Sequence, residues 1–294
     1  MLLKGSNREI RLRGPVLPAG AGTRSVCWHD WPLEGAAFDV SIAEEKLGGG
    51  SNCRLVRVDA GPVRRSAAGR SVAFISDLHW DGSMAGLYEK LASAINALEA
   101  DWIVFGGDLC MYMDKVPEAM EWLGTLKAGR GKCAVPGNRE SPVAWLDTAF
   151  WKKAYGRAGF TYLCNECLDA ETFLIFGLDD ARFGEPDWRP LAGMAGSRRP
   201  VLCISHNPDA AGLAGEHEFI GDMLLCGHTH SGQIRLPWYG PLYSSSIFGR
   251  QFLHGLKQRG DGTLCLVSSG IGEAGCSLFK RRVLCPREIV FLRF

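Results

Sequence analysis

The chain has 294 residues, of which 46% are hydrophobic and 22% charged, and its formal net charge is +1. This composition supports a large buried core in one or two α/β domains, and the small net charge argues against nucleic acid as a partner. No segment reaches the roughly 18 consecutive apolar residues of a membrane span, and the apolar run at the amino terminus is too short for a signal peptide. A soluble or peripherally membrane-bound intracellular protein is expected.

The segment from residue 1 to about residue 70 differs from the rest of the chain. It contains the glycine-rich stretches "GPVLPAGAGTR" and "KLGGGSN", and its stretches "REIRLRG" and "NCRLVRV" alternate polar and apolar residues as half-buried strands do. We predict an extension over residues 1–52 that bears strands, is partly ordered and has no catalytic signal. A single domain is predicted over residues 53–294.

From Ser71 onward the sequence alternates strands and helices, which favours a layered α/β architecture. Apolar strands are predicted at "SVAFIS", "DWIVF", "KCAVP", "FTYLCN", "TFLIF", "PVLCIS" and "DMLLC". Such runs, bounded by turn residues, are typical of strands that are buried on both faces. Ligand sites in these architectures form where the strands end in loops.

Three helices are predicted between the first strands. Their expected inward faces contain Leu87, Leu91, Ile95 and Leu98 in the first helix, and Val116, Met120, Leu123 and Leu126 in the second. The third helix, in "SPVAWLDTAFWKKAYGRAG", is predicted to begin with Ser141 as its cap and Pro142 at its first helical position.

Eleven cysteines are scattered through apolar runs such as "VLCIS" and "LCLVSS". Their odd number and apolar surroundings indicate buried free thiols in a reducing cytosol rather than a disulfide framework. Cys164 and Cys167 form one Cys-x-x-Cys pair. Without a second pair at ligand spacing, this pair is weak evidence for zinc or redox chemistry.

Polar side chains stand directly after several predicted strands. They are two aspartates, one asparagine and four histidines: Asp77, His79, Asp108, Asn138, His206, His228 and His230. If these strands share a sheet, the side chains converge at one of its edges. Their carboxylate, amide and imidazole donors suit Mn²⁺, Fe or Zn²⁺ better than Ca²⁺ or Mg²⁺. Seven donors exceed the needs of one four-coordinate ion and suffice for two ions that share a carboxylate.

Each of these elements has a simpler explanation when it is taken alone. An aspartate or asparagine after a strand is often a turn residue or a helix cap, and a single histidine is more often a satisfied polar residue than a ligand. The ordered series Asp-x-His, Gly-Asp, Gly-Asn, His and Gly-His-x-His, with each member at a strand end, favours a metal site.

The blocks "SDLHW", "GGDL", "PGNRE", "SHNPD" and "GHTHSGQ" resemble the signature of the calcineurin-like metallophosphoesterases, over about residues 53–294. The stretch "GHTHSGQIRLPWYGPLY" resembles a bacterial branch that includes UDP-2,3-diacylglucosamine hydrolases, with Ser231 where that branch has a glycine. The resemblance implies a four-layer α-β-β-α sandwich with the amino-terminal extension added to it.

The resemblance also implies two metal positions. One ion would be held by Asp77, His79, Asp108 and His230, and the other by Asp108, Asn138, His206 and His228, so that Asp108 bridges them. Manganese is the expected metal, with iron or zinc as alternatives. Two cations about 3.5–4 Å apart would lower the pKa of a shared water, and the hydroxide formed from it would attack phosphorus while the ions neutralise the phosphate oxygens. Asp108, Asn138, Arg139 and His206 are the predicted catalytic residues.

Arg139 occupies the place where the family usually has a histidine, which is thought to protonate the leaving oxygen or to steady the attacking hydroxide. Arginine stays protonated and transfers no proton, but it clamps phosphate oxygens well. The alternative is a structural salt bridge to Glu140 or another acid. If the acid is missing, the favoured substrate has a leaving group that needs no proton, such as the phosphate of a pyrophosphate. One group of the similar diacylglucosamine hydrolases also has arginine here.

The expected function is therefore hydrolysis of a pyrophosphate or phosphodiester bond at a dinuclear metal site. The preferred substrate is UDP-2,3-diacylglucosamine, which would give UMP and lipid X in the lipid A biosynthesis of a bacterium. The partner would be a small phosphate compound, in this case a lipid-linked nucleotide, and not a nucleic acid. The alternatives are a nucleotide phosphodiesterase, a general phosphomonoesterase and a non-catalytic scaffold.

Two groups of aromatic residues are compatible with an acylated substrate and with a cytoplasmic location peripheral to the inner membrane. The first contains Trp145, Phe150, Trp151 and Tyr155 beside Lys152 and Lys153, and the second contains Trp238 and Tyr239. Surfaces that combine aromatic and basic residues suit a membrane interface. Packing of the same aromatic residues in the core is an equally good explanation.

Overall fold

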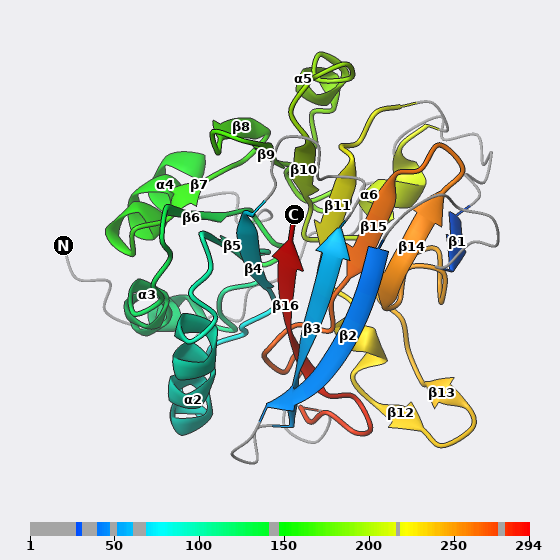
Figure 1. Ribbon diagram of the computed structural model, residues 1–294. Coiled ribbons are helices and arrows are strands. Elements are labelled where there is room, and N and C mark those ends of the chain that lie inside the picture. Colours follow the sequence, from blue (N-terminus) through cyan, green and yellow to red (C-terminus); the bar gives the residue numbers. More distant parts are fainter. Residues whose placement is uncertain are drawn as a thin grey trace.

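The computed structural model describes residues 28–30, 40–47, 52–60, 69–140, 147–215, 218–275 and 280–294. Within these ranges the chain forms two seven-stranded sheets that face each other, with helices on their outer sides (Figure 1). The first sheet has the order β2 (Val40–Leu47), β3 (Cys53–Ala60), β16 (Arg287–Arg293), β4 (Ser71–Ile75), β5 (Trp102–Phe105), β6 (Gly131–Ala134) and β7 (Thr161–Tyr162). Strands β4 to β7 are parallel, and β16 pairs with β4 in the antiparallel sense.

The second sheet contains the later strands of the chain. Its order is β1 (Trp28–Asp30), β14 (Gly255–Arg259), β15 (Leu264–Val267), β11 (Met223–Cys226), β10 (Val201–Ile204), β9 (Leu174–Gly177) and β8 (Glu166–Asp169). Strands β9, β10, β11 and β15 are parallel, whereas β8 and β14 are antiparallel to their neighbours. A separate hairpin is formed by β12 (Arg235–Leu236) and β13 (Gly240–Pro241).

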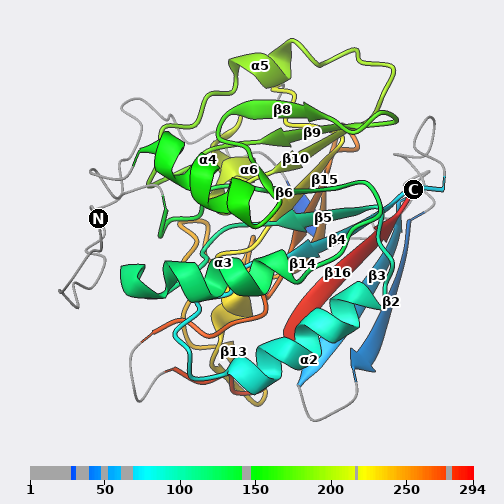
Figure 2. The same ribbon diagram turned by 90° about the vertical axis from the view of Figure 1, so that its left-hand side faces the viewer.

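Helices cover the outer face of each sheet. Helices α2 (Ala85–Asn96), α3 (Val116–Gly124) and α4 (Thr148–Arg157) lie along the first sheet, as Figure 2 shows. The shorter helices α5 (Arg189–Ala192) and α6 (Asp209–Leu213) belong to the second sheet, and the short 3₁₀ helices η2 (Met113–Lys115) and η3 (His230–Gly232) follow strand ends. No helix in the described ranges combines the length and the apolar character that crossing a bilayer requires.

Three apolar clusters separate the four layers. In β4, Ala73 and Ile75 pack under helices α2 to α4, whereas Val72 and Phe74 point between the two sheets. The third cluster packs the outer face of the second sheet, including Cys203, against α5 and α6. Because successive side chains of a strand point to opposite faces, a strand in this position needs apolar residues throughout. The predicted four-layer α-β-β-α sandwich is confirmed.

The predicted strands after Ser71 are present, and the predicted helices differ in two respects. Helix α2 ends at Asn96 and α3 at Gly124, so Leu98 and Leu126 lie beyond the helix ends, and the start of α4 also differs. This helix begins at Thr148, and the side chain of Asp147 accepts a hydrogen bond from the Phe150 N–H as its cap. The predicted cap at Ser141 and the first position at Pro142 lie outside the described residues, as does Trp145. Asp147 provides the same capping chemistry six residues later.

Parts of the amino-terminal extension belong to the sheets. Strand β2 pairs with β3 over eight residues, and β1 pairs with β14. The stretch "REIRLRG" lies outside the described residues. The division of the chain between residues 52 and 53 stays a prediction.

The first aromatic group and the cysteines behave as core residues. Trp151 and Tyr155 of α4 are buried against the first sheet, which favours the packing explanation for that group. Within the described residues the nine cysteines are free thiols, and seven of them are buried. Trp238 and Tyr239, by contrast, are exposed.

Candidate metal centre and active site

The seven predicted ligand residues come together from both sheets. Asp77, His79, Asp108 and Asn138 follow β4, β5 and β6 of the first sheet, and the other three histidines follow β10 and β11 of the second. The expectation of one shared sheet edge was therefore wrong. The carboxyl ends of two sets of parallel strands face each other, and a hydrogen bond from His206 Nδ1 to the Gly106 carbonyl, 2.7 Å long, joins the two sets.

The backbone at this site is held in unusual conformations. Asp77, His79, Asp108, His228 and His230 all have φ between 44° and 68°, in the left-handed region that side chains other than glycine rarely adopt. Such conformations cost free energy and persist where the surrounding structure requires them, commonly at functional sites. Each strand turns sharply at its end and presents its polar side chain inward.

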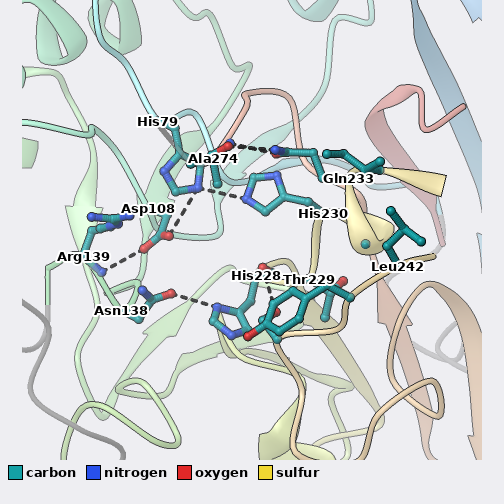
Figure 3. A pocket seen from close by; sticks show the side chains of 15 residues that line it. His79, Asp108, Asn138, Arg139, His228, Thr229, His230, Gln233, Leu242 and Ala274 are labelled. Atoms are coloured by element: carbon teal, nitrogen blue, oxygen red, sulfur yellow. Dashed lines mark hydrogen bonds and ion pairs between the residues drawn. The ribbon is translucent and has the colours of Figure 1, made fainter. Parts of the chain in front are cut away.

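One half of the cluster contains two imidazoles and the carboxylates beside them. His79 Nε2 lies 2.9 Å from His230 Nε2, and His230 Nε2 lies 3.4 Å from Asp77 Oδ1. Asp108 Oδ2 is 3.4 Å from His79 Nε2. Figure 3 shows the rings of His79 and His230 pointing toward each other. Three possible metal-ligand atoms, a carboxylate oxygen of Asp77 and ring nitrogens of His79 and His230, lie within 4.8 Å of one another. This spacing allows them to hold one metal ion.

The other half is centred on Asn138. Its Oδ1 atom lies 2.8 Å from His228 Nδ1 and 3.1 Å from His206 Nε2. Asp108 Oδ1 is 3.5 Å from His206 Nε2. Since a carbonyl only accepts, the bond from His206 Nδ1 to Gly106 leaves Nε2 facing the cluster, as metal-binding histidines usually do.

The two aspartates lie between the halves. The two carboxylate oxygens of Asp108 face different histidines, Oδ2 toward His79 and Oδ1 toward His206. Asp77 Oδ1 is 3.9 Å from both His79 Nε2 and His206 Nε2, so Asp77 also lies near both groups. Gly227 has to be a glycine here, because a Cβ at its position would be 2.3 Å from Asp77 Oδ2. Asp108 therefore lies between the two groups of histidines.

The electrostatics of the cluster suit bound cations. Burial lowers the pKa of both His79 and His228 to about 3, and it lowers the pKa of His230 well below the usual value, so these imidazoles are neutral and keep a lone pair. Burial also acts to lower the pKa of His206, but nearby carboxylates, chiefly Asp108, outweigh it and raise the pKa to about 10. Buried neutral imidazoles and carboxylates match the donors that divalent transition metals prefer. In addition, His228 Nε2 is buried without a hydrogen-bond partner. The residues fit a divalent metal site.

Arg139 lies at the same site but makes no salt bridge to Glu140. Its backbone N–H donates to Asp108 Oδ1 at 2.9 Å, and its side chain lines the pocket, where Nε has no hydrogen-bond partner (Figure 3). The carboxylate of Glu140 instead accepts hydrogen bonds from the backbone N–H groups of Asp108, Leu109 and Gly137. Within the described residues no ion pair of Arg139 is found, and Arg139 is one of the residues that line the pocket.

Two supporting residues were not predicted from the sequence. Glu140 ties the loop after β5 to the loop after β6, and the sequence offered it only as a partner for Arg139. Arg282 is the second: its Nη2 donates to the Ser269 carbonyl at 2.6 Å and lies 3.1 Å from His230 Nδ1. The stretch "KRRVLC" around Arg282 has no feature that marks a half-buried residue with several hydrogen-bond partners. Asp179 and Asp180, which follow β9, accept backbone N–H groups of the turn that they begin.

A pocket of about 560 Å³ opens over the cluster. Its floor contains His79, Asp108, Asn138, Arg139 and the two histidines after β11. Its walls come mainly from residues that follow η3, including Gln233, Ile234, Leu242 and Tyr243. A polar floor under a partly apolar wall is the usual form of a small-molecule site.

Comparison with known proteins agrees with this geometry. The family described as calcineurin-like phosphoesterase matches residues 70–232, which include the seven clustered side chains. The uncharacterised metallophosphoesterase YkuE of Bacillus subtilis is 31% identical over 203 residues, which cover 66% of this chain and 68% of YkuE. The chain therefore belongs to the calcineurin-like phosphoesterase family and is a metal-dependent hydrolase of phosphoester or phosphoanhydride bonds.

Two further relatives have names that describe an activity. Phosphodiesterase YaeI of Escherichia coli is 25% identical over 246 residues, which cover 81% of this chain and 87% of YaeI. UDP-2,3-diacylglucosamine pyrophosphatase LpxG of Chlamydia trachomatis is 25% identical over 285 residues, which cover 76% of this chain and 83% of LpxG. Other relatives are longer, and the match spans 59% of an uncharacterised metallophosphoesterase of Helicobacter pylori.

Proposed function

We propose that the protein hydrolyses the pyrophosphate bond of a nucleotide-linked, acylated sugar, with UDP-2,3-diacylglucosamine as substrate and UMP and 2,3-diacylglucosamine 1-phosphate as products. The observation that supports a hydrolytic site most strongly is the position of Asp108. Its two oxygens face the two histidine groups at the floor of the pocket, 3.4 Å from His79 and 3.5 Å from His206.

The roles of the side chains follow from their positions. Asp77, His79 and His230 would hold one cation, Asn138, His206 and His228 the other, and Asp108 would contact both. When bound, two divalent cations supply a water of lowered pKa and neutralise charge on the phosphate. We propose manganese, with iron or zinc as alternatives, because these donors accept all three.

Arg139 would bind phosphate oxygens beside the cations. Arg139 lines the pocket, and an arginine guanidinium in this place would bind phosphate oxygens by bidentate hydrogen bonds. Arginine does not release a proton at working pH. A leaving group of low basicity, such as the phosphate of UMP, departs without one.

The acylated substrate is supported by the pocket walls and by one relative. Ile234, Leu242 and Tyr243 give the pocket an apolar side that a simple phosphate ester would not need. LpxG is named as a pyrophosphatase for UDP-2,3-diacylglucosamine. The name of YaeI supports a second candidate, the hydrolysis of a phosphodiester of another small molecule.

The test compares two substrates with the same enzyme. Protein loaded with Mn²⁺, Fe²⁺ or Zn²⁺ is assayed with UDP-2,3-diacylglucosamine and with bis-p-nitrophenyl phosphate, before and after treatment with a chelator. We expect chelator-sensitive release of UMP at a higher kcat/KM than hydrolysis of the model diester. Activity on the diester alone would favour the second candidate. A metal-loaded protein that is inert toward both would refute a hydrolytic role and indicate a binding scaffold.

A further inference from the structure

Exposed apolar residues are concentrated at one place on the molecule. Nine large hydrophobic side chains are exposed within the described residues, and all of them except Tyr112 belong to two short segments. These eight residues are named here the rim patch: Leu236, Trp238, Tyr239, Leu242, Tyr243, Ile247, Val283 and Leu284. Single exposed apolar residues are normal on a soluble protein, but a contiguous group marks an interaction surface.

The two segments of the rim patch are joined by backbone hydrogen bonds. Arg235 N–H donates to the Val283 carbonyl at 3.0 Å, and Val283 N–H donates to the Gln233 carbonyl at 2.9 Å. These bonds place Val283 and Leu284 beside the β12–β13 hairpin, which projects from the body of the molecule (Figure 1). Trp238, between β12 and β13, has a relative exposure of 104% and a φ of 61°.

Within the two segments that form the rim patch, the charged side chains have one sign. The sequence has no aspartate or glutamate from residue 223 to residue 260 or from residue 280 to residue 287. Arg250 and Arg281 are exposed in these segments. The guanidinium of Arg250 lies 5.4 Å from the centre of the Tyr239 ring and donates to the Tyr239 carbonyl at 3.3 Å. Aromatic and aliphatic side chains with neighbouring arginines suit the interface of an anionic bilayer.

The rim patch is continuous with the pocket. Leu242 and Tyr243 line the pocket and are also largely exposed, with relative exposures of 55% and 72%. The pocket therefore opens beside the exposed hairpin. A surface placed against the patch would lie at the mouth of the pocket.

We propose that the rim patch docks the protein on an anionic phospholipid bilayer. Trp238 and Leu284 would enter the interfacial region, and Arg250 and Arg281 would contact lipid phosphates. The pocket would then open toward the bilayer surface, where an acylated substrate is held by its chains. Only this last consequence rests on the proposed function, because docking itself requires no catalysis.

The experiment measures vesicle binding by the full chain. Flotation is carried out with vesicles of phosphatidylcholine alone and of phosphatidylcholine mixed with phosphatidylglycerol. We expect binding to the mixed vesicles, a loss of roughly tenfold in the double variant W238S/L284S, and a loss of a few-fold in R281Q. Hydrolysis of the water-soluble diester should be the same in W238S/L284S as in the original protein.

A matched control is available at the other end of the molecule. Helix α5 lies opposite the β12–β13 hairpin in both views (Figure 1, Figure 2), and Arg198 follows α5 in an exposed position. R198Q removes the same charge as R281Q, so equal losses in the two variants would show a non-specific charge effect and overturn the proposal. W238F gives a second measurement, since it should keep vesicle binding while reducing the quenching of tryptophan fluorescence by brominated lipid.

Other outcomes distinguish a bilayer from a second copy of the chain as the partner that binds the rim patch. Absence of binding to the mixed vesicles would overturn the proposal. So would a concentration-dependent dimer that dissociates in W238S/L284S, because the patch would then bind a second copy of the chain. Vesicle binding without hydrolysis of UDP-2,3-diacylglucosamine would leave the docking intact and refute only the substrate.

Discussion

The buried cluster and the rim patch are neighbours in space but are built in opposite ways. In the cluster, Asp77, His206 and His230 are at most 5% exposed, and polar contacts of 2.7 to 3.9 Å hold the residues together. In the rim patch, large apolar side chains such as Trp238 are in solvent. The cluster residues make their polar contacts with one another, whereas the side chains of the rim patch extend away from the described part of the chain. The difference suggests that chemistry and docking depend on separate residues and are separable by mutation.

The largest expected effect comes from Asp108. Replacement D108N removes the charge that faces both histidine groups, so we expect kcat/KM for either substrate to fall by at least about 100-fold and the metal content to decrease. Enzyme kinetics and elemental analysis of the purified protein measure the two effects. Vesicle binding should not change, which sharpens the comparison between the cluster and the patch.

D147N provides the matched control for this substitution. Asparagine caps a helix as well as aspartate does, and Asp147 uses one side-chain oxygen to accept the Phe150 N–H. This variant should therefore keep activity, metal content and stability. If D108N kept its metal and its activity, the proposed bridging role would be wrong.

The second effect concerns Arg139. If its guanidinium clamps a pyrophosphate, R139H should lower kcat/KM for UDP-2,3-diacylglucosamine by roughly 100-fold and should spare or raise hydrolysis of the model diester. R139K keeps the charge without the planar fork, so its activity should be intermediate. The ratio of the two kcat/KM values is the measurement, and an unchanged ratio in R139H would exclude the clamp.

The third effect concerns Glu140, which touches the cluster only through backbone. Its carboxylate accepts N–H bonds from Asp108, Leu109 and Gly137 at 2.7 to 3.1 Å. In E140Q one acceptor becomes a donor, so at least one of these buried N–H groups loses its partner. We expect a loss of stability of about 1–3 kcal/mol and a decrease in metal affinity of roughly 10-fold or more.

Urea unfolding and metal titration test this prediction. The exposed Glu121 of α3 supplies the control E121Q, which should change neither quantity. Unaltered metal affinity in E140Q, together with reduced stability, would show that Glu140 supports the fold without organising the site.

The sequence predicted the candidate metal-ligand residues of the cluster well, because each of them follows the end of an apolar strand. It did not show that β4 to β6 and β10 to β11 lie in different sheets, since strand ends carry no information about strand partners. The position of β16 between β3 and β4 depends on pairing with residues more than 200 positions away. Local periodicity contains no record of such contacts.

Arg282 could not be predicted for the same reason. Its hydrogen bonds reach the Ser269 and Gly272 carbonyls, and its Nη2 lies beside His230 Nδ1, 52 positions earlier in the chain. Partial burial of an arginine such as Arg282 depends on whether the fold offers carbonyl acceptors at that point. The exposure of Trp238 was equally undetermined, because an aromatic residue in a loop suits either a core or a surface.

The smallest expected effect lies at Ser231, between the cluster and the hairpin of the rim patch. Ser231 is buried with φ 54° and ψ 28°, and its hydroxyl accepts a hydrogen bond from Arg235 Nη1 at 2.8 Å. S231A and S231G both remove the hydroxyl, but only glycine also relieves the left-handed backbone. S231G should therefore be more stable than S231A by about 1 kcal/mol in urea unfolding. Equal stabilities would show that this backbone stores no strain, and the cluster and the hairpin would then be joined by a relaxed turn.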